Sequence, residues 1–580
     1  MAKNILTLTS NEAFNYFMKS EQFCSFELPE YFSFDDLLKY VMDTIEDTSY
    51  SDCLSDISPN DLEDANLTIL LNKDGRYAVR PLILANPYLY YFLVREMCNK
   101  KNWKKIKECF SKFQVPHITS TALPVIKEEP ESFHKSTTIL NWWNTIEQRS
   151  LELSLEYRYM FVTDITNCYG TVNPETLDWA LSLKGTKYSR KDNHQIANNI
   201  MLFLKALQQG RNIGIPQGSA AFDFVGEIIL GYSDLLLHNK LLEKRIKDGY
   251  EILRYRDDYR IFCNDKGVLE EISYILQEVL ESLNFRMNSQ KTKISDSIVT
   301  DSIKPDKLWY IENTPIFNKK GCDFDGIQKH FFYILLFSRK HPNGGQLKTM
   351  LSDLDKRIIK RLTPKEKEKD NKNKRKTFSL DKEIEAVEKM QEDKLKEIAD
   401  PFAKKESGNV FDNLKKYKAK KEPGKIYENI RAICAVALQI AIENNSVTHY
   451  VLRIISRLAA SMENETDRWD IIEKVYNKLC NRPNSKYDQL WLQNITFQQD
   501  IKQERNRYDL PLCRLAMGED VAIWNNDWLK PELVKNLPLN TICNYELLET
   551  VAPIITFRET REYDDFLNDD MLNGMVIEMS

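Results

Sequence analysis

The stretch "RYRDDYRIF", residues 254–262, constrains the fold more than any other part of this chain. Two adjacent carboxylates, Asp257 and Asp258, stand between the β-prone runs "EILRY" and "YRIFC". These flanks predict a β-hairpin whose turn presents both acids, although neither acid is the Asn or Gly that tight turns favour. An ordinary surface turn is the alternative interpretation of this stretch taken alone.

The other Asp-Asp pairs have simpler explanations. Asp35 and Asp36 in "SFDDLLKYV" are expected at the start of a helix, where acids satisfy free amides and the helix dipole. The pairs at 564–565 and 569–570 lie in an acidic C-terminal stretch, and we expect a solvated face or a frayed end there. Only the pair at 257–258 therefore has the context of a functional site.

The composition, 42% hydrophobic and 29% charged over 580 residues, is that of a soluble protein with several globular domains. The formal net charge of −5 excludes a wholly basic nucleic-acid coat, so a polyanion must bind at a local positive surface. Residues 355–376, with eleven Lys or Arg against four Asp or Glu, offer such a surface.

The eleven cysteines include no C-x-x-C pair, which argues against a zinc ribbon and a disulfide framework. We expect a reducing, cytoplasmic location. The sequence contains no apolar run of membrane-spanning length, and its first residues lack the apolar core of a signal peptide. We therefore expect no membrane association.

The patterning predicts an α+β protein of three parts. Residues 1–312 mix helical patterns with strand-like runs such as "YRYMFVTDI" and a long apolar helix, "FVGEIILGYSDLLLHNKLLEKRI". Residues 313–425 form a connecting region with a charged insertion rich in Lys and Glu. Residues 426–580 contain four apolar segments of helical length, and their spacing predicts stacked, HEAT-like helix pairs that serve packing and partner binding.

A third carboxylate can join the acid pair. Asp164 ends the apolar, β-prone run in "YMFVTDITNCYGTV". Magnesium prefers oxygen ligands and usually takes one or two protein carboxylates plus substrate phosphates, so Asp164 and Asp257 are suited to hold two ions. Two such ions can activate an attacking hydroxyl and stabilise a leaving pyrophosphate. The pattern predicts nucleotidyl transfer.

Four segments together resemble the reverse transcriptase family. The run around Asp164, with Tyr169 five positions later, is similar to motif A, and "GIPQGSAAFDFVGEIIL" (214–230) is similar to motif B. The tetrapeptide "YRDD" (255–258) resembles the Y-x-D-D of motif C, and "LNFRMNSQKTKI" (283–294) resembles motif D. The segments occur in the family's order, which implies a right-hand polymerase with fingers and palm in residues 1–312.

The resemblance implies roles for the acids and the motif D lysine. Asp164 and Asp257 are implied to be the principal metal ligands, with Asp258 supporting them. The cofactor is then Mg²⁺, with Mn²⁺ as a substitute. Lys291 is implied to donate a proton to pyrophosphate, and a solvent-facing lysine is the alternative.

The resemblance also implies a nucleotide site. Tyr169 would lie beneath the sugar and exclude a 2′-hydroxyl, which implies dNTP substrates; a core aromatic is the alternative. Gln217 and Gly218 would lie where the backbone approaches the nucleotide closely, and Tyr255 belongs to the same site. Arg80 would reach the triphosphate from the fingers, unless it makes a structural salt bridge.

The arginines beside the acid pair have several interpretations. Arg254, Arg256 and Arg260 are expected to offset the local negative charge or to contact the nucleic-acid backbone. Solvated strand residues are the alternative.

Within the family, the chain resembles the abortive-infection and related defence-associated reverse transcriptases of bacteria. The resemblance covers residues 75–300, including the W-W element at 142–143, and extends to the helical C-terminus in character. Motif B departs from many relatives at Ala221 and Phe222, which puts the usual template-facing groove in doubt. Retron signatures and group II maturase and endonuclease portions are not found.

This resemblance implies a DNA polymerase acting in antiphage defence. Members of this kind use a protein hydroxyl as primer or an associated noncoding RNA, and some copy no conventional template. The implied product is single-stranded DNA, covalently attached when a protein hydroxyl is the primer, and the implied assembly is a homo-oligomer. The alternatives are a conventional template-copying RNA-directed DNA polymerase, a catalytically inactive RNA-binding scaffold, and an RNA polymerase or nucleotide cyclase with a similar palm.

Overall fold

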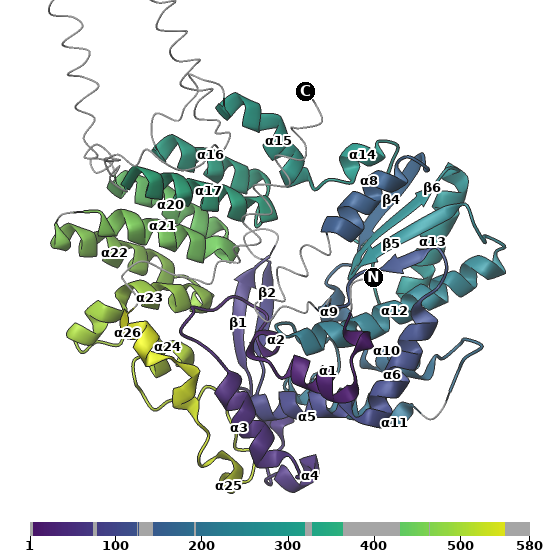
Figure 1. The fold of residues 1–580 in the computed structure, drawn as a ribbon, viewed down its shortest axis with the longest axis horizontal. Coiled ribbons are helices and arrows are strands. Elements are labelled where there is room, and N and C mark those ends of the chain that lie inside the picture. Colours follow the sequence, from purple (N-terminus) through teal and green to yellow (C-terminus); the bar gives the residue numbers. More distant parts are fainter. Residues whose placement is uncertain are drawn as a thin grey trace, which may run out of the picture.

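The protein is an α+β molecule in which a small sheet lies between a stack of helices and a larger sheet (Figure 1). The computed structural model describes residues 4–73, 78–124, 126, 143–190, 193–318, 327–362, 430–462 and 464–550. Residues 363–429, which include most of the predicted charged insertion and basic segment, lie outside the described residues, as do Trp142 and the acidic pairs at 564–565 and 569–570.

The larger sheet has five strands in the order β3-β5-β6-β4-β7. Its core is antiparallel, and only the short edge strand β3 runs parallel to its neighbour β5. The strands are β3 (Ile118–Ser120), β4 (Tyr159–Asp164), β5 (Tyr250–Tyr255), β6 (Asp258–Cys263) and β7 (Lys293–Ser295). The strands predicted around the acids are thus confirmed, and all of them belong to one sheet.

Helices cover both faces of this sheet (Figure 1). Helices α12 (Ala220–Glu243) and α13 (Lys266–Ser282) cover one face. The other face carries a small apolar cluster that includes Leu153 of α8 (Arg149–Leu153) and Ile298 of α14 (Ile298–Asp301). The sheet is therefore a central layer, and side chains alternate between two distinct environments along each strand.

Helix α12 is the long apolar helix expected from the sequence, and it is buried along most of its length. A helix that is apolar around its whole circumference belongs in a core. Three acids nevertheless lie within its apolar part, Asp223, Glu227 and Asp234, separated by four and seven residues. This spacing places them on one face of the helix.

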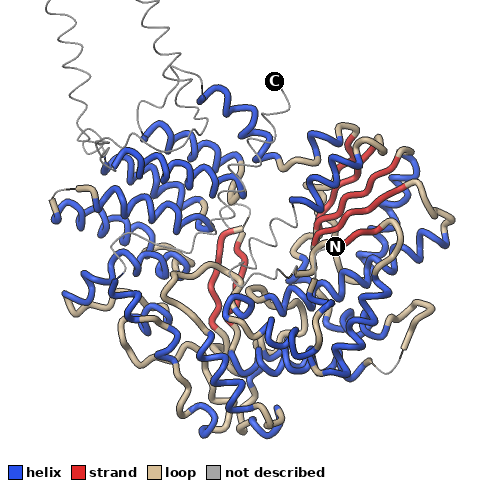
Figure 2. Tube along the Cα trace, in the orientation of Figure 1, coloured by secondary structure: helices blue, strands red, loops and turns tan. Residues whose placement is uncertain are grey.

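The smaller sheet is the antiparallel hairpin β1 (Leu67–Asn72) and β2 (Val79–Leu84), which lies between the helical stack and the larger sheet (Figure 2). Helix α3 begins at Asp35, as predicted, and Asp35 accepts a hydrogen bond from the Ser20 amide at 3.1 Å. Helix α3 spans Asp35–Ile45, and the remaining helices of residues 1–318 are α1 (Ser10–Phe17), α2 (Ser20–Phe23), α4 (Tyr50–Cys53), α5 (Pro87–Cys98), α6 (Lys100–Phe113), α9 (Cys168–Thr171), α10 (Pro174–Ser182), α11 (His194–Ala206) and α15 (Pro305–Asn318).

The four C-terminal helices expected from the sequence are present, and they pack against one another in a stack (Figure 1). Two earlier helices join this stack, although the sequence analysis placed their residues in the connecting region; their apolar residues, such as Phe331 and Ile334, are buried in it. The stack contains α16 (Ile327–Lys340), α17 (Gly345–Leu362), α20 (Ile430–Glu443), α21 (Thr448–Ala460), α22 (Glu465–Cys480) and α23 (Lys486–Lys502).

The chain after α23 returns to the N-terminal half. Trp524 donates from Nε1 to the Leu84 carbonyl at 3.1 Å, and the Tyr88 hydroxyl donates to the Leu533 carbonyl at 2.6 Å. This segment contains α24 (Pro511–Ala516), α25 (Pro531–Val534) and α26 (Tyr545–Thr550). Residues from both ends of the sequence therefore share one core. Among the described helices, none combines the length and the hydropathy needed to cross a bilayer.

Candidate active site

The β5–β6 hairpin differs from the prediction in one detail. Tyr255 pairs with Asp258, so the two turn residues are Arg256 and Asp257, and Asp258 is the first residue of β6. Arg256 has φ 54°, a left-handed conformation that tight turns usually give to Gly or Asn. Two contacts hold it there: its carbonyl accepts from Arg254 Nη1 at 3.2 Å, and its guanidinium pairs with Asp223.

Strand pairing brings the third carboxylate to the hairpin, as the sequence predicts. Asp164 lies opposite Asp258 in the β4–β6 ladder, and the Ile165 amide donates to the Asp257 carbonyl at 3.1 Å. Asp164 is buried, with 8% of its surface exposed. Its Oδ2 accepts from Lys291 Nζ at 2.8 Å, whereas its buried Oδ1 accepts no hydrogen bond from any described residue.

The crowding of these acids raises the pKa values of Asp257 and Asp258. Burial, together with the neighbouring Asp164 charge, raises the pKa of Asp257. Desolvation by the surrounding protein, with the Asp257 and Asp164 charges, raises the pKa of Asp258 to about 6, even though part of this side chain reaches solvent. Like charges held close together disfavour ionisation, and a bound cation removes that penalty.

The residues present fit a magnesium site in which the protein supplies only one or two of the ligands. The described residues contain no ready-made cluster of three or more Asp, Glu, His or Cys side chains that could enclose a metal. Magnesium needs only one or two carboxylates when substrate phosphates and water complete its shell. Asp164 and Asp257 can supply these carboxylates. The Oδ1 atom of Asp164 accepts no hydrogen bond from a described residue, and it is an oxygen of the kind that magnesium prefers.

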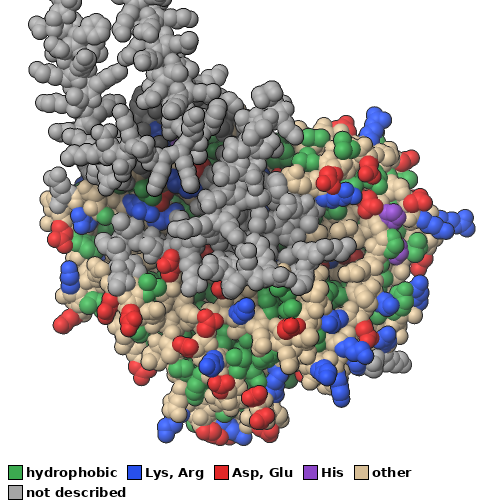
Figure 3. Space-filling view, viewed as in Figure 1, with side chains coloured by type: hydrophobic (Ala, Val, Ile, Leu, Met, Phe, Trp, Pro, Cys, Tyr) green, Lys and Arg blue, Asp and Glu red, His purple; other side chains and the backbone are tan. Residues whose placement is uncertain are grey.

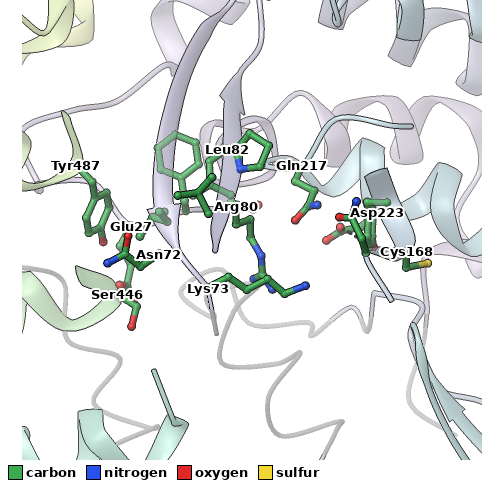
Figure 4. A pocket seen from close by; sticks show the side chains of 18 of the residues that line it. Glu27, Asn72, Lys73, Arg80, Leu82, Cys168, Gln217, Asp223, Ser446 and Tyr487 are labelled. Atoms are coloured by element: carbon green, nitrogen blue, oxygen red, sulfur yellow. Dashed lines mark hydrogen bonds between the residues drawn. The ribbon is translucent and has the colours of Figure 1, made fainter. Parts of the chain in front are cut away.

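A cavity of about 450 Å³ opens beside the turn (Figure 4). It brings together five of the residues predicted from the sequence: Arg80, Tyr169, Gln217, Gly218 and Asp257. Lys73, at the end of β1, also lines it, and Figure 4 shows Lys73 and Arg80 beside each other in the cavity. The sequence analysis missed Lys73, because a single lysine beside a loop carries no distinctive pattern.

Tyr255 is not among the residues that line the cavity. Its ring packs on the opposite face of the sheet, with the apolar cluster that contains Leu253 and Phe262. Side chains alternate along β5, so the position that puts Arg254 toward α12 turns Tyr255 away from it. The structure therefore does not bring Tyr255 to the predicted nucleotide site.

Gly218 has a structural explanation as well as a functional one. It has φ 127°, and a Cβ atom there would lie 2.7 Å from the Ile83 carbonyl oxygen of β2. The Ile83 amide donates to the Gln217 carbonyl at 2.7 Å, and the Ser25 amide donates to the Gly218 carbonyl at 2.8 Å. The close backbone approach expected at Gly218 is thus to the β1–β2 hairpin, which this loop attaches to the palm.

The arginines around the acid pair are structural. Arg254 is fully buried and donates to both Glu227 and Asp234 of α12 at 2.7 to 3.0 Å. Arg260 is 9% exposed and donates to Ser150 Oγ and to the Ser302 carbonyl, both at 2.9 Å. Neither residue is a solvated strand residue or is available to a nucleic-acid backbone.

The acidic partners on α12 were missed in the sequence analysis. Their signal is acids at helical spacing inside an otherwise apolar helix, because buried carboxylates require a cationic partner. The arginines of a nearby strand are the natural partners for them.

Comparison with known proteins identifies a family that part of the chain resembles. Residues 99–328 match the protein-family model for "Reverse transcriptase (RNA-dependent DNA polymerase)", and this match contains Asp164, Asp257 and Asp258. Residues 99–328 are therefore similar to the domain shared by reverse transcriptases, a family of RNA-dependent DNA polymerases. Enzymes of this family use divalent metal ions, dNTPs and a nucleic-acid substrate.

Several solved structures are similar to the chain. A truncated apo telomerase from Candida tropicalis is 12% identical with a TM-score of 0.27; the match covers 42% of this chain and 51% of that one. A telomerase from Candida albicans bound to a fragment of telomeric RNA is 11% identical with a TM-score of 0.26, over 73% of this chain and 68% of that one. The chain thus spans about half the length of the first of these structures. A search of curated proteins gives no match.

Proposed function

We propose that the reverse transcriptase domain is an active, magnesium-dependent DNA polymerase whose metal ligands are Asp164 and Asp257, supported by Asp258. The observation that carries the proposal is the meeting of these acids at the end of β4 and in the β5–β6 turn, with one Asp164 oxygen buried and unused by any described residue. Metal ions bound there would activate the attacking hydroxyl and offset the charge of the leaving pyrophosphate.

The remaining side chains of the cavity have roles consistent with nucleotide binding. Arg80 and Lys73 come from the β1–β2 hairpin and offer positive charge to a triphosphate. Tyr169 offers an aromatic surface to the sugar and so favours dNTPs. Lys291 neutralises Asp164 in this structure, and we propose that it donates a proton to the departing pyrophosphate during the reaction.

The biological role in the proposal is antiphage defence with protein-primed synthesis. It is supported by the resemblance of motifs A to D and of the helical C-terminus to defence-associated reverse transcriptases. In this proposal a hydroxyl of the protein attacks the first dNTP, pyrophosphate leaves, and the DNA product stays covalently attached. An associated noncoding RNA as template is the variant of the same proposal.

The experiment is a synthesis assay without added primer or template. Purified full-length protein, freed of bound RNA by nuclease, is incubated with Mg²⁺ and each labelled dNTP, separately and mixed. We expect a labelled product that migrates with the protein until proteolysis and is absent from the Asp257→Ala/Asp258→Ala variant. Asp36→Ala, which removes one exposed acid of the other described pair, is the matched control and should retain activity.

Other outcomes separate the alternatives. Product that requires an added primer and RNA template would contradict protein priming and establish a conventional template-copying enzyme. Synthesis only after RNA is restored would assign the template to that RNA. No incorporation under any of these conditions would favour a catalytically inactive scaffold.

A further inference from the structure

Tyr169 is held at two points by residues one turn apart on α12. Its hydroxyl donates to Asp223 Oδ1 at 3.0 Å. Its ring lies against Gly226, where a Cβ atom would come within 3.3 Å of Tyr169 Cε1. Residues three apart on a helix share one face, so the ring and the hydroxyl contact the same side of α12.

Asp223 is itself fixed by the catalytic turn. Its Oδ2 accepts from Arg256 Nη2 at 2.7 Å, and Arg256 immediately precedes Asp257. Tyr169, Asp223 and Arg256 all line the cavity, and Figure 4 shows Asp223 on the same side of it as Gln217 and Cys168. A short chain of contacts therefore connects the predicted sugar contact to the turn that carries a metal ligand.

In this chain of contacts, the donor and the acceptor of each hydrogen bond are determined. Burial and the Asp223 charge raise the pKa of the Tyr169 phenol well above its usual value, so the hydroxyl keeps its proton and remains a donor. The Arg256 guanidinium supplies the opposite charge that a partly buried carboxylate requires. Each group thus has one role: Arg256 donates to Asp223, and Asp223 accepts from both neighbours.

We propose that Asp223 is a positioning residue for sugar selection: its carboxylate, anchored by Arg256, fixes the Tyr169 ring against Gly226 and so sets the space available for a 2′-hydroxyl. This inference rests on the proposed function, in which Tyr169 contacts the sugar. An aromatic side chain excludes a single hydroxyl only if its position is well defined, since shifts of about 1 Å change reaction rates by large factors. The contact of the Tyr169 ring with Gly226 and the hydrogen bond from its hydroxyl to Asp223 define the position of the ring.

The test is the ratio of kcat/KM for a dNTP to kcat/KM for the matching rNTP, measured on the full chain under the conditions that give product. We expect Asp223→Ala and Tyr169→Phe each to lower this ratio roughly fivefold to tenfold, the value of one hydrogen bond. The double variant should be no lower than either single variant, because both changes remove the same contact. Tyr169→Ala, which removes the ring, should lower the ratio furthest.

Asp223→Asn provides a conservative comparison that keeps an acceptor oxygen for the tyrosine. Asp223→Asn should keep a higher ratio of kcat/KM for the dNTP to kcat/KM for the rNTP than Asp223→Ala. If the alanine variant does not fold, Asp223→Asn replaces it in the test. Additive effects in the double variant, or equal ratios for Asp223→Asn and Asp223→Ala, would overturn the positioning role.

The two proposals fail in different ways. If Tyr169→Ala changes the ratio and Asp223→Ala does not, the positioning role fails and the assignment of Tyr169 stands. If Tyr169→Ala leaves the ratio unchanged, Tyr169 is not the sugar contact, and the inference falls with that part of the proposed function.

Discussion

Arg254 illustrates how individual residues fix the β5–β6 hairpin. Its guanidinium lies fully buried between Glu227 and Asp234 and also donates to the Arg256 carbonyl of the turn. Burying charges is costly unless each has a partner, and here two carboxylates share one guanidinium that can donate to both at once. The contact joins α12 to β5 and holds the turn that carries Asp257.

Replacing Arg254 with Met should lower the free energy of unfolding by about 3–5 kcal/mol, because it leaves two buried carboxylates without a cation. Arg254→Lys should recover only part of this, since an ammonium cannot reproduce the planar set of donors. Chemical denaturation followed by circular dichroism measures the effect. Arg149→Met, which removes an exposed ion pair, should change stability by less than about 1 kcal/mol; equal midpoints for the Arg254 and Arg149 variants would contradict the assignment.

At the scale of elements, the loop before α12 connects the palm to the β1–β2 hairpin. Backbone hydrogen bonds join Gln217 to Ile83 and Gly218 to Ser25, and Gly218 has no room for a side chain. The position of Arg80 and Lys73 relative to Asp257 therefore depends on the contact between this loop and β2.

Gly218→Ala should reduce polymerisation at least tenfold and destabilise the protein by about 1–3 kcal/mol. The reason is that the new methyl group meets the Ile83 carbonyl at 2.7 Å, and φ 127° is strained for any residue with a Cβ. Steady-state incorporation and thermal unfolding report the two effects. Gly345→Ala is the matched control, because nothing lies within 4 Å of a Cβ there and its φ is ordinary; a Gly218→Ala variant that behaves like this control would show that the loop can shift freely.

The helical stack contains a buried carboxylate that makes its stability depend on pH. Asp488 of α23 is fully buried, accepts from Thr448 at 2.8 Å and pairs with Arg482 at 2.7 Å. Burial raises the pKa of Asp488 from 3.8 to about 6. A carboxyl with a raised pKa in the folded state contributes stability that is fully present below about pH 4 and is lost as the pH rises through 6.

The melting temperature of the wild type minus that of Asp488→Asn should therefore fall as the pH rises from 4 to 7. The corresponding change in free energy is at most roughly 3 kcal/mol, since one pKa unit corresponds to about 1.4 kcal/mol. Differential scanning fluorimetry across this range measures it. Asp509→Asn, which removes an exposed carboxylate nearby, should show no such slope; a difference for Asp488→Asn that rises with pH would reverse the conclusion.

For the whole molecule, the return of the C-terminal segment to the N-terminal half means that the protein does not fold around the five-stranded sheet alone. Trp524 and Trp528 are buried, and the Asn526 side chain accepts from Asn86 at 2.7 Å. These contacts join positions more than four hundred residues apart in the chain, so they form only after most of the molecule is in place.

Trp528→Ala should destabilise the protein by roughly 3–5 kcal/mol and lower polymerase activity, although Trp528 lines no part of the described cavity. The effect arises because the cavity left behind lies in a core shared by both ends of the chain. Thermal unfolding and primer-extension assays measure it. Leu155→Ala, at a position 88% exposed, should be within about 0.5 kcal/mol of wild type; normal activity and stability in Trp528→Ala would show that the C-terminal segment is dispensable.

The sequence by itself determined the local structure around the acids and the helices of the C-terminal region. Apolar, β-prone runs flank Asp164, Asp257 and Asp258 and specify strands. The acids stand where these runs end, so their meeting at the ends of neighbouring strands could be predicted. The helix from 220 to 243 and the helices after 426 could be predicted in the same way, because burial imposes its period on neighbouring residues.

Only the tertiary structure decided which charges became partners and which side of the sheet each residue faces. Asp223, Glu227 and Asp234 could have been paired with any of several arginines, and Tyr255 faces away from the cavity because the pairing of Arg254 with α12 fixes the register of the strand. The choice depends on desolvation and packing between segments distant in sequence, which no local pattern contains. The acids at the ends of β4 and β5 can be recognised from the sequence pattern, whereas the contacts that hold them in place form only when the chain folds.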